Sequence, residues 1–159
     1  MKNTLILHEI VTARLKRAKT GGGFEPAVEL DVGDLIVNAG RTFIASRIGA
    51  NSPDAISHMA VGTVSTAAGL TDTTLTGEIL RKALAVSSAT DNNLYTAVAT
   101  IGGAADSVTS IAIVEAGLFN HASSGQGTMY QRVTFSSIVL AASDIFQLSL
   151  QTRVGSNTI

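Results

Sequence analysis

The residue types that most often carry out catalysis or bind metals are few in this chain and widely spaced. There are three histidines, His8, His58 and His121, and no cysteine. A zinc site needs several ligands at short, regular spacings, which these histidines do not show. The sequence also lacks the G-x-S-x-G pattern of many hydrolases and the H-E-x-x-H pattern of metalloproteases. We therefore expect no enzymatic activity, no catalytic residue, no metal site and no cofactor.

The residue with the strongest suggestion of chemistry is Glu115, an acid inside the apolar segment 111–119. A buried carboxyl group with a raised pKa can act as an acid catalyst. The alternative is a buried carboxylate paired with a basic residue, for which Arg81 and Arg132 are the candidates. We favour the structural pair of Glu115 with one of these arginines, because no second reactive group accompanies the acid.

Basic residues are concentrated at the start of the chain. Five of the 11 basic residues lie within the first 19 positions, namely Lys2, Arg14, Lys16, Arg17 and Lys19. Nucleic-acid-binding segments usually interleave aromatic residues with such charges, and none occurs here. The net charge of −1 gives the whole chain no electrostatic attraction to nucleic acid or to a membrane. The segment is then either a solvated face or terminal extension, or a docking arm in which Arg14, Lys16, Arg17 and Lys19 contact a protein partner.

Three consecutive glycines, Gly21–Gly23, follow this basic segment. They lack the Lys-Ser/Thr pair of a phosphate-binding P-loop. Because glycine loses much backbone entropy on folding, three in a row favour a linker over the inside of an element. The predicted organisation is an N-terminal arm with a glycine hinge, residues 1–23, and a β-sandwich domain, residues 24–159. Apolar spacing in residues 3–18 fits a helix or a strand equally well.

Periodicity in the rest of the chain predicts one helix and many short strands. The helix covers residues 35–48, with Asp34 as a candidate N-cap and Gly49 at its end. Residues 76–82 could form one helical turn with an exposed Glu78–Arg81 pair. Alternating apolar and polar residues predict strands at 54–64, 83–88, 94–101, 111–120, 128–140 and 145–154. The fold class expected is mainly β, an antiparallel β-sandwich or barrel with one helix and an extended N-terminal arm.

Composition favours a protein that covers part of its surface with other molecules. Charged residues make up 14% of the chain, against about 25% in ordinary soluble domains. So little charge leaves a surface weakly solvated, which favours an oligomer or a lattice component. The sequence shows no secretory signal pattern and no apolar run long enough to cross a membrane.

Five segments, taken in order, resemble a group of small structural proteins of tailed bacteriophages. They are NAGRTFIASRI at 38–48, ISHMAVGT at 56–63, DTTLTGEILRK at 72–82, IVEAGLFN at 113–120 and GTMYQRVTF at 127–135. The resemblance spans residues 38–154, and the segments are specific as a set more than one by one. Val64, where a second glycine is usual, and Ile113–Val114, where Ile-Thr is more common, depart from the pattern.

The resemblance implies a non-enzymatic virion structural protein made in the cytoplasm of a bacterial host. We expect a capsid cement or decoration protein, a homotrimer that binds the major capsid protein or other virion proteins. The alternatives are a tail, baseplate or fibre-attachment protein and, from a different class, a carbohydrate-binding module. The last is disfavoured by the absence of Trp and the presence of only two Tyr, which leave few platforms for stacking sugars.

Overall fold

A computed structural model describes residues 4–32, 34–49, 53–90 and 94–157. Within them, one sheet, sheet A, contains β1 (Thr4–Ala18), β2 (Phe24–Val32), β6 (Val86–Thr90), β7 (Leu94–Gly102) and β10 (Ile145–Asn157). The second, sheet B, contains β3 (Asp34–Ile36), β4 (His58–Gly62), β5 (Glu78–Ala83), β8 (Ala112–Phe119) and β9 (Met129–Val139). One helix, α1 (Asn38–Ile48), lies between β3 and β4.

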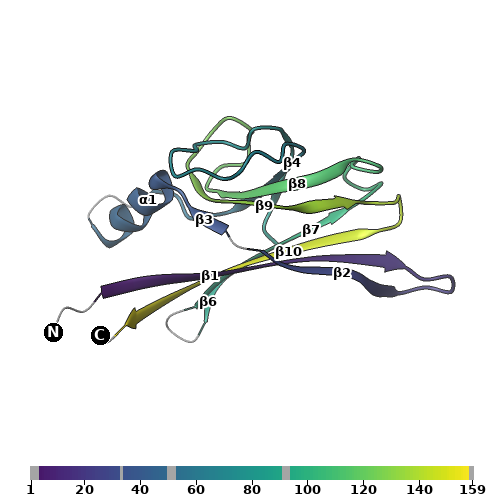
Figure 1. Cartoon of the computed structure of the whole chain (residues 1–159), viewed down its shortest axis with the longest axis horizontal. Helices are drawn as coiled ribbons and strands as arrows, with labels where there is room; N and C mark the ends of the chain where they lie inside the picture. Colours follow the sequence, from purple (N-terminus) through teal and green to yellow (C-terminus); the bar gives the residue numbers. More distant parts are fainter. Residues whose placement is uncertain (1–3, 33, 50–52, 91–93, 158–159) are drawn as a thin grey trace.

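The two sheets form an antiparallel sandwich (Figure 1). The strand order is β2-β1-β10-β7-β6 in sheet A and β3-β9-β8-β4-β5 in sheet B, and every strand pair is antiparallel. Neither sheet closes on itself, so the predicted β-sandwich is confirmed and the barrel alternative is wrong. The strands predicted at 111–120 and 128–140 are present as β8 and β9, which pair with each other.

The core lies between the sheets and follows directly from strand alternation. In sheet A, side chains in register form three buried rows: Val11, Leu150 and Ala97; Ala13, Leu148 and Ala99; Leu15, Phe146 and Ile101. Sheet B supplies Met59, Val61, Ile113, Ala116, Leu118, Val133 and Ile138 to the same core. The alternation predicted for 145–154 is confirmed at Phe146, Leu148 and Leu150, while the side chain of Val154 lies outside the described residues.

The prediction of a separate N-terminal arm is wrong, because its residues form a strand inside sheet A. β1 pairs along its length with β10, from Thr4 opposite Asn157 to Lys16 opposite Ile145, and with β2 on its other side. Val11, Ala13 and Leu15 are buried in the core. The apolar residues of this segment therefore match the two-residue period of a strand, which resolves the helix-or-strand ambiguity.

The three glycines form the turn between β1 and β2 rather than a linker. Their φ angles are +115°, +97° and +81° for Gly21, Gly22 and Gly23, a region that residues with a Cβ rarely adopt. The turn is closed by hydrogen bonds between the backbones of Lys19 and Gly22 (3.1 Å) and of Lys19 and Gly23 (3.1 Å). The tip of this hairpin projects past the end of the sandwich (Figure 1).

The helix starts three residues later than predicted. Asp34–Ile36 pairs with β9 as strand β3, so the N-cap position belongs to Val37 and not to Asp34. The α1 helix packs on β9, where Phe43 meets the ring of Tyr130 edge-on at 6.0 Å. Gly40 makes the closest approach, because a Cβ built there would overlap the backbone carbonyl of Tyr130.

Replacing Gly40 with alanine is therefore expected to destabilise the fold by about 1–3 kcal/mol, the range for overpacking a tight site. Helix propensity alone predicts the opposite, a gain of about 1 kcal/mol. Gly49→Ala at the end of the same helix is the matched control, since a Cβ there makes only ordinary contacts. Urea denaturation of both variants measures the difference, and a stabilised Gly40→Ala variant would contradict the close packing.

Candidate functional site

The outer face of sheet B, which points away from sheet A, is covered by two loops. The first, residues 63–77, joins β4 to β5, and the second, residues 120–128, joins β8 to β9 (Figure 1). A small apolar cluster lies beneath them, formed by Val37, Ala60, Leu75, Phe119 and Met129. Two arginines from the sheet hold these loops in place, and they form the densest group of polar contacts among the described residues.

Arg132 on β9 anchors the 63–77 loop. It lies opposite Gly117 on β8. Its side chain is only 1% exposed. Nη1 donates to Asp72 Oδ2 at 2.6 Å, and Nη2 donates to the Thr66 carbonyl at 3.0 Å and to Thr76 Oγ1 at 3.2 Å. One side chain thus binds both ends of the loop to the sheet.

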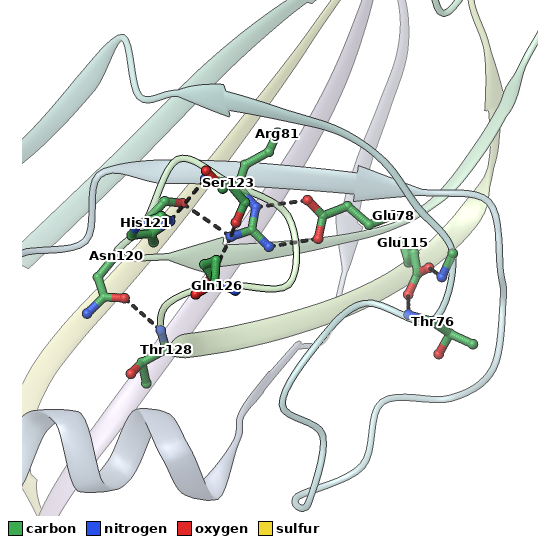
Figure 2. Close-up of polar contacts among 10 residues, drawn as sticks. Thr76, Glu78, Arg81, Glu115, Asn120, His121, Ser123, Gln126 and Thr128 are labelled. Atoms are coloured by element: carbon green, nitrogen blue, oxygen red, sulfur yellow. Dashed lines mark hydrogen bonds and ion pairs between the residues drawn. The ribbon is translucent and has the colours of Figure 1, made fainter.

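Glu115 on β8 is the fully buried counter-ion of Arg132. Its Oε2 accepts from Arg132 Nε at 3.1 Å and Nη2 at 2.8 Å. The carboxylate also accepts the backbone N–H of Gly77 at 2.7 Å and of Thr76 at 3.3 Å, the latter drawn in Figure 2. Gly62 faces this carboxylate, and a Cβ there would overlap Glu115 Oε1 and the Gly77 carbonyl. The charge is buried but fully hydrogen-bonded, as a buried ion must be.

Arg81 on β5 anchors the 120–128 loop. Figure 2 shows its guanidinium between Glu78 and the loop: Nε and Nη2 donate to the two Glu78 oxygens at 2.8 and 2.7 Å. Nη1 donates to three loop carbonyls, those of His121 (3.2 Å), Ser123 (2.8 Å) and Gln126 (3.0 Å). The guanidinium also stacks on the ring of Phe119, 3.7 Å from its centroid.

A β-bulge places Glu78 and Arg81 on the same face of sheet B. Gly62 pairs with Glu78 while its neighbour Val61 pairs with Leu80, so Ile79 is the extra residue. Residues three apart in a regular strand point to opposite faces, and the bulge restores the same face. The prediction of a helical turn with an exposed pair is wrong on both counts, because the segment is a strand and both side chains are buried.

The 120–128 loop carries further bonds of its own. Asn120 Oδ1 accepts the Thr128 N–H at 2.6 Å, and His121 Nδ1 accepts the Ser123 N–H at 3.1 Å (Figure 2). Gly127 has φ +76°, and a Cβ there would overlap the His121 side chain. Hydrogen bonds therefore join the two ends of the loop, link His121 to Ser123 within it, and connect it to Arg81.

The electrostatics of the Arg132 anchor favour the charged form of its ion pair with Asp72. Burial by itself lowers the pKa of Arg132, but the hydrogen bonds and charges of Asp72 and Glu115 outweigh it and raise the pKa above its usual value. Burial likewise raises the pKa of Asp72, but bonds from the Gly69 N–H and Arg132 hold it below its usual value. Burial, with Arg81 and His121 nearby, lowers the pKa of His58 and so favours its neutral form.

Comparison with protein-family models, with curated proteins and with solved structures found no match. Function must therefore be argued from the chain's own residues and contacts.

The structure brings together only some of the residues singled out from the sequence. Glu115 pairs with Arg132, one of its two candidate partners. Arg81, the other candidate, pairs with Glu78, and this pair is buried rather than exposed as predicted. The loop partners of Arg132, Asp72 and Thr66, were not predicted. They contribute from an irregular loop, where sequence periodicity gives no indication of which side chains point inward.

The four basic residues predicted to contact a partner lie on the opposite sheet, along β1 and the following turn. Arg14 forms an exposed ion pair with Glu29 of β2 at 2.8 Å. Arg17 is 60% exposed and lies 3.9 Å from Asp144, beside a shallow pocket of about 380 Å³. Lys16 is half-buried and Lys19 is exposed in the turn. They belong to a hairpin, not to an independent arm.

The arrangement on sheet B is suited to fixing the two loops in one conformation. The guanidinium groups of Arg81 and Arg132 and the Glu115 carboxylate are occupied by bonds within the chain. In the described ranges, no group of three His, Asp or Glu residues could hold a metal ion. The one helix described, α1, is too short and too polar to pass through a bilayer.

Proposed function

We propose that this chain is a non-enzymatic structural protein of a tailed-bacteriophage virion, and that it acts as a capsid cement or decoration protein. The supporting observation is that three of the segments that resemble phage proteins contribute the buried ion pairs on sheet B. Segment 72–82 supplies Asp72, Glu78 and Arg81, segment 113–120 supplies Glu115, and segment 127–135 supplies Arg132. The residues that carry the resemblance are thus the residues that build the two loop anchors.

The physical character of the sandwich agrees with such a role. A cement protein must hold its shape while many copies bind a repeating lattice, where weak individual contacts add up through multivalency. Buried ion pairs fix two loops on one face, and the β1–β2 hairpin projects with Lys19 and Phe24 exposed at its tip. We assign the contact with the major capsid protein or another virion protein to this hairpin tip.

Copy number in purified virions tests the proposal. A cement protein is present in hundreds of copies per particle, and quantitative gel densitometry against the major capsid protein should find that stoichiometry. A few copies to a few tens would support the tail, baseplate or fibre-attachment alternative. Absence from purified particles would contradict both.

The hairpin contact needs a variant that leaves the sandwich intact. Deleting residues 1–19 would remove β1 from within sheet A, so it cannot separate binding from folding. The paired change Lys19→Glu with Phe24→Ser alters only exposed side chains and is expected to weaken binding to undecorated capsids at least tenfold. Arg41→Glu on exposed α1 is the control for charge reversal, and equal binding by both variants would exclude the hairpin.

A further inference from the structure

Two histidines lie beside Arg81, the anchor of the 120–128 loop. His58 of β4 pairs with Phe119 of β8, on whose ring the Arg81 guanidinium stacks. His121 lies in the loop itself, and its backbone carbonyl accepts from Arg81 Nη1 at 3.2 Å. Histidine is the side chain whose charge ordinarily changes between about pH 5 and 8. The position of both residues therefore couples the anchor to mild changes of pH.

The His121 side chain holds the loop through a bond that requires its neutral form. Its Nδ1 accepts the backbone N–H of Ser123 at 3.1 Å (Figure 2). Only a neutral imidazole has a lone pair to offer at Nδ1, because the protonated ring carries a hydrogen on both nitrogens. Protonation replaces this bond with two N–H groups that face each other. The Ser123 carbonyl also accepts from Arg81 Nη1 at 2.8 Å, so a shift of this residue weakens the anchor.

His58 adds an electrostatic cost to the same event. Burial, and then the charges of Arg81 on β5 and His121 in the loop, lower its pKa from the ordinary 6.5. Arg81 is itself paired with Glu78, and Phe119 on β8 is uncharged. The unfolded chain therefore binds this proton more tightly than the folded chain does. Stability is complete above the ordinary pKa and falls as the pH drops through it toward the lowered pKa.

The 63–77 loop provides an internal reference, because its anchor contains no histidine. Residues 63–77 include none, and the loop is held by Arg132 through Asp72. The Gly69 N–H and Arg132 hold the pKa of the Asp72 carboxyl below its usual value. This carboxylate therefore stays charged at a pH that protonates histidines, and the 63–77 loop should remain in place.

We propose that the 120–128 loop is an acid-sensitive element of this protein, closed at neutral pH and released when His58 and His121 become protonated. Phe119 and Met129 flank the loop and are buried in the small apolar cluster beneath it. Release of the loop uncovers apolar surface that the closed loop hides. The proposal does not rest on the capsid role, because loop release is measured on the purified protein alone.

A nitroxide spin label on the loop measures its mobility directly. The chain has no cysteine, so Ser124→Cys creates a single labelling site at an exposed position of the loop. Between about pH 7.5 and about pH 5.5, the rotational correlation time of this label is expected to fall at least twofold. A label at Ala67→Cys, an exposed position of the 63–77 loop, should show no change over the same range.

Replacing the histidines separates their protonation from other effects of acid. The asparagine Oδ1 corresponds to the imidazole Nδ1, so His121→Asn keeps an acceptor for the Ser123 N–H but cannot be protonated. This single change, at an exposed position, should reduce the response of the Ser124→Cys label. Adding His58→Asn should abolish the response. His8→Asn, on β1 in sheet A, is the matched control and should leave it intact.

The outcomes that contradict the proposal are distinct from one another. A label at Ser124→Cys that keeps its mobility in acid would overturn it, as would an equal change at Ala67→Cys. A full response in the His58→Asn, His121→Asn double variant, or in His121→Asn alone, would exclude the histidines as the cause. Circular dichroism should be the same at both pH values, and a lost β-sheet signal in acid would mean global unfolding instead of loop release.

Discussion

Replacing Glu115 with alanine is expected to destabilise the protein by about 3–5 kcal/mol, the usual effect of removing one partner of a buried ion pair. Arg132, 1% exposed, would keep Asp72 as its one carboxylate partner, and that side chain is partly exposed. The N–H groups of Gly77 and Thr76 would also lose their acceptor. Urea denaturation followed by circular dichroism measures the loss.

Two comparisons separate the buried pair from a general effect of removing an acid. Glu29→Ala removes one partner of the Arg14 pair, in which both side chains are about half exposed, and should cost less than about 1 kcal/mol. The double variant Glu115→Ala with Arg132→Met should be less destabilised than the sum of its single variants, because the fully buried pair is removed together and only the partly exposed Asp72 loses its counter-ion. A negligible effect of Glu115→Ala would contradict the buried pair.

Replacing Arg81 with methionine is expected to lower the free energy of unfolding by about 3–5 kcal/mol, as for Glu115→Ala. The change leaves the buried Glu78 carboxylate without its counter-ion and removes the donor to three carbonyls of the 120–128 loop. Because the loop loses its central anchor, its peptide bonds should become accessible. Limited proteolysis with mapping of the cleavage sites is expected to show new cuts within 120–128, and urea denaturation gives the stability change.

Arg81→Lys is the matched control for charge. Lysine retains the positive charge but lacks the planar fork that binds both Glu78 oxygens while reaching the loop. It should recover only part of the stability and leave the loop more sensitive to protease than in the wild type. A lysine variant as stable and as resistant as the wild type would mean that charge alone, and not the fork geometry, holds the loop.

Sequence patterns predict the fold best where one physical constraint acts alone. β10 is buried on one side only, so its two-residue alternation shows plainly at Phe146, Leu148 and Leu150. Two glycines inside elements lie at close approaches. A Cβ at Gly40 would overlap the backbone of Tyr130, and a Cβ at Gly117 would crowd the Gln131 carbonyl and the Leu75 side chain.

The prediction failed where distant pairing decided the local structure. Asp34–Ile36 continues the helical apolar pattern, but pairing with β9 makes it a strand. The Glu78–Arg81 spacing mimics a helical pair because a bulge at Ile79 shifts the register of β5. Glu115 and Arg132 could be named from the sequence because a lone charge in an apolar strand needs a partner. Asp72 could not be named from the sequence, because apolar residues in the 63–77 loop show no regular spacing.

The strand order of sheet A has a consequence for synthesis on the ribosome. β10 follows β7 in the chain but lies between β1 and β7 in the sheet, and it pairs with both. The β1–β2 and β6–β7 hairpins can form before β10 is made, but within sheet A only β10 joins them. Pairings this far apart along a chain are slow to form, since a very long loop must close first. The nascent chain therefore carries two unjoined strand edges until β10 has been made, the interval in which chaperone protection matters most.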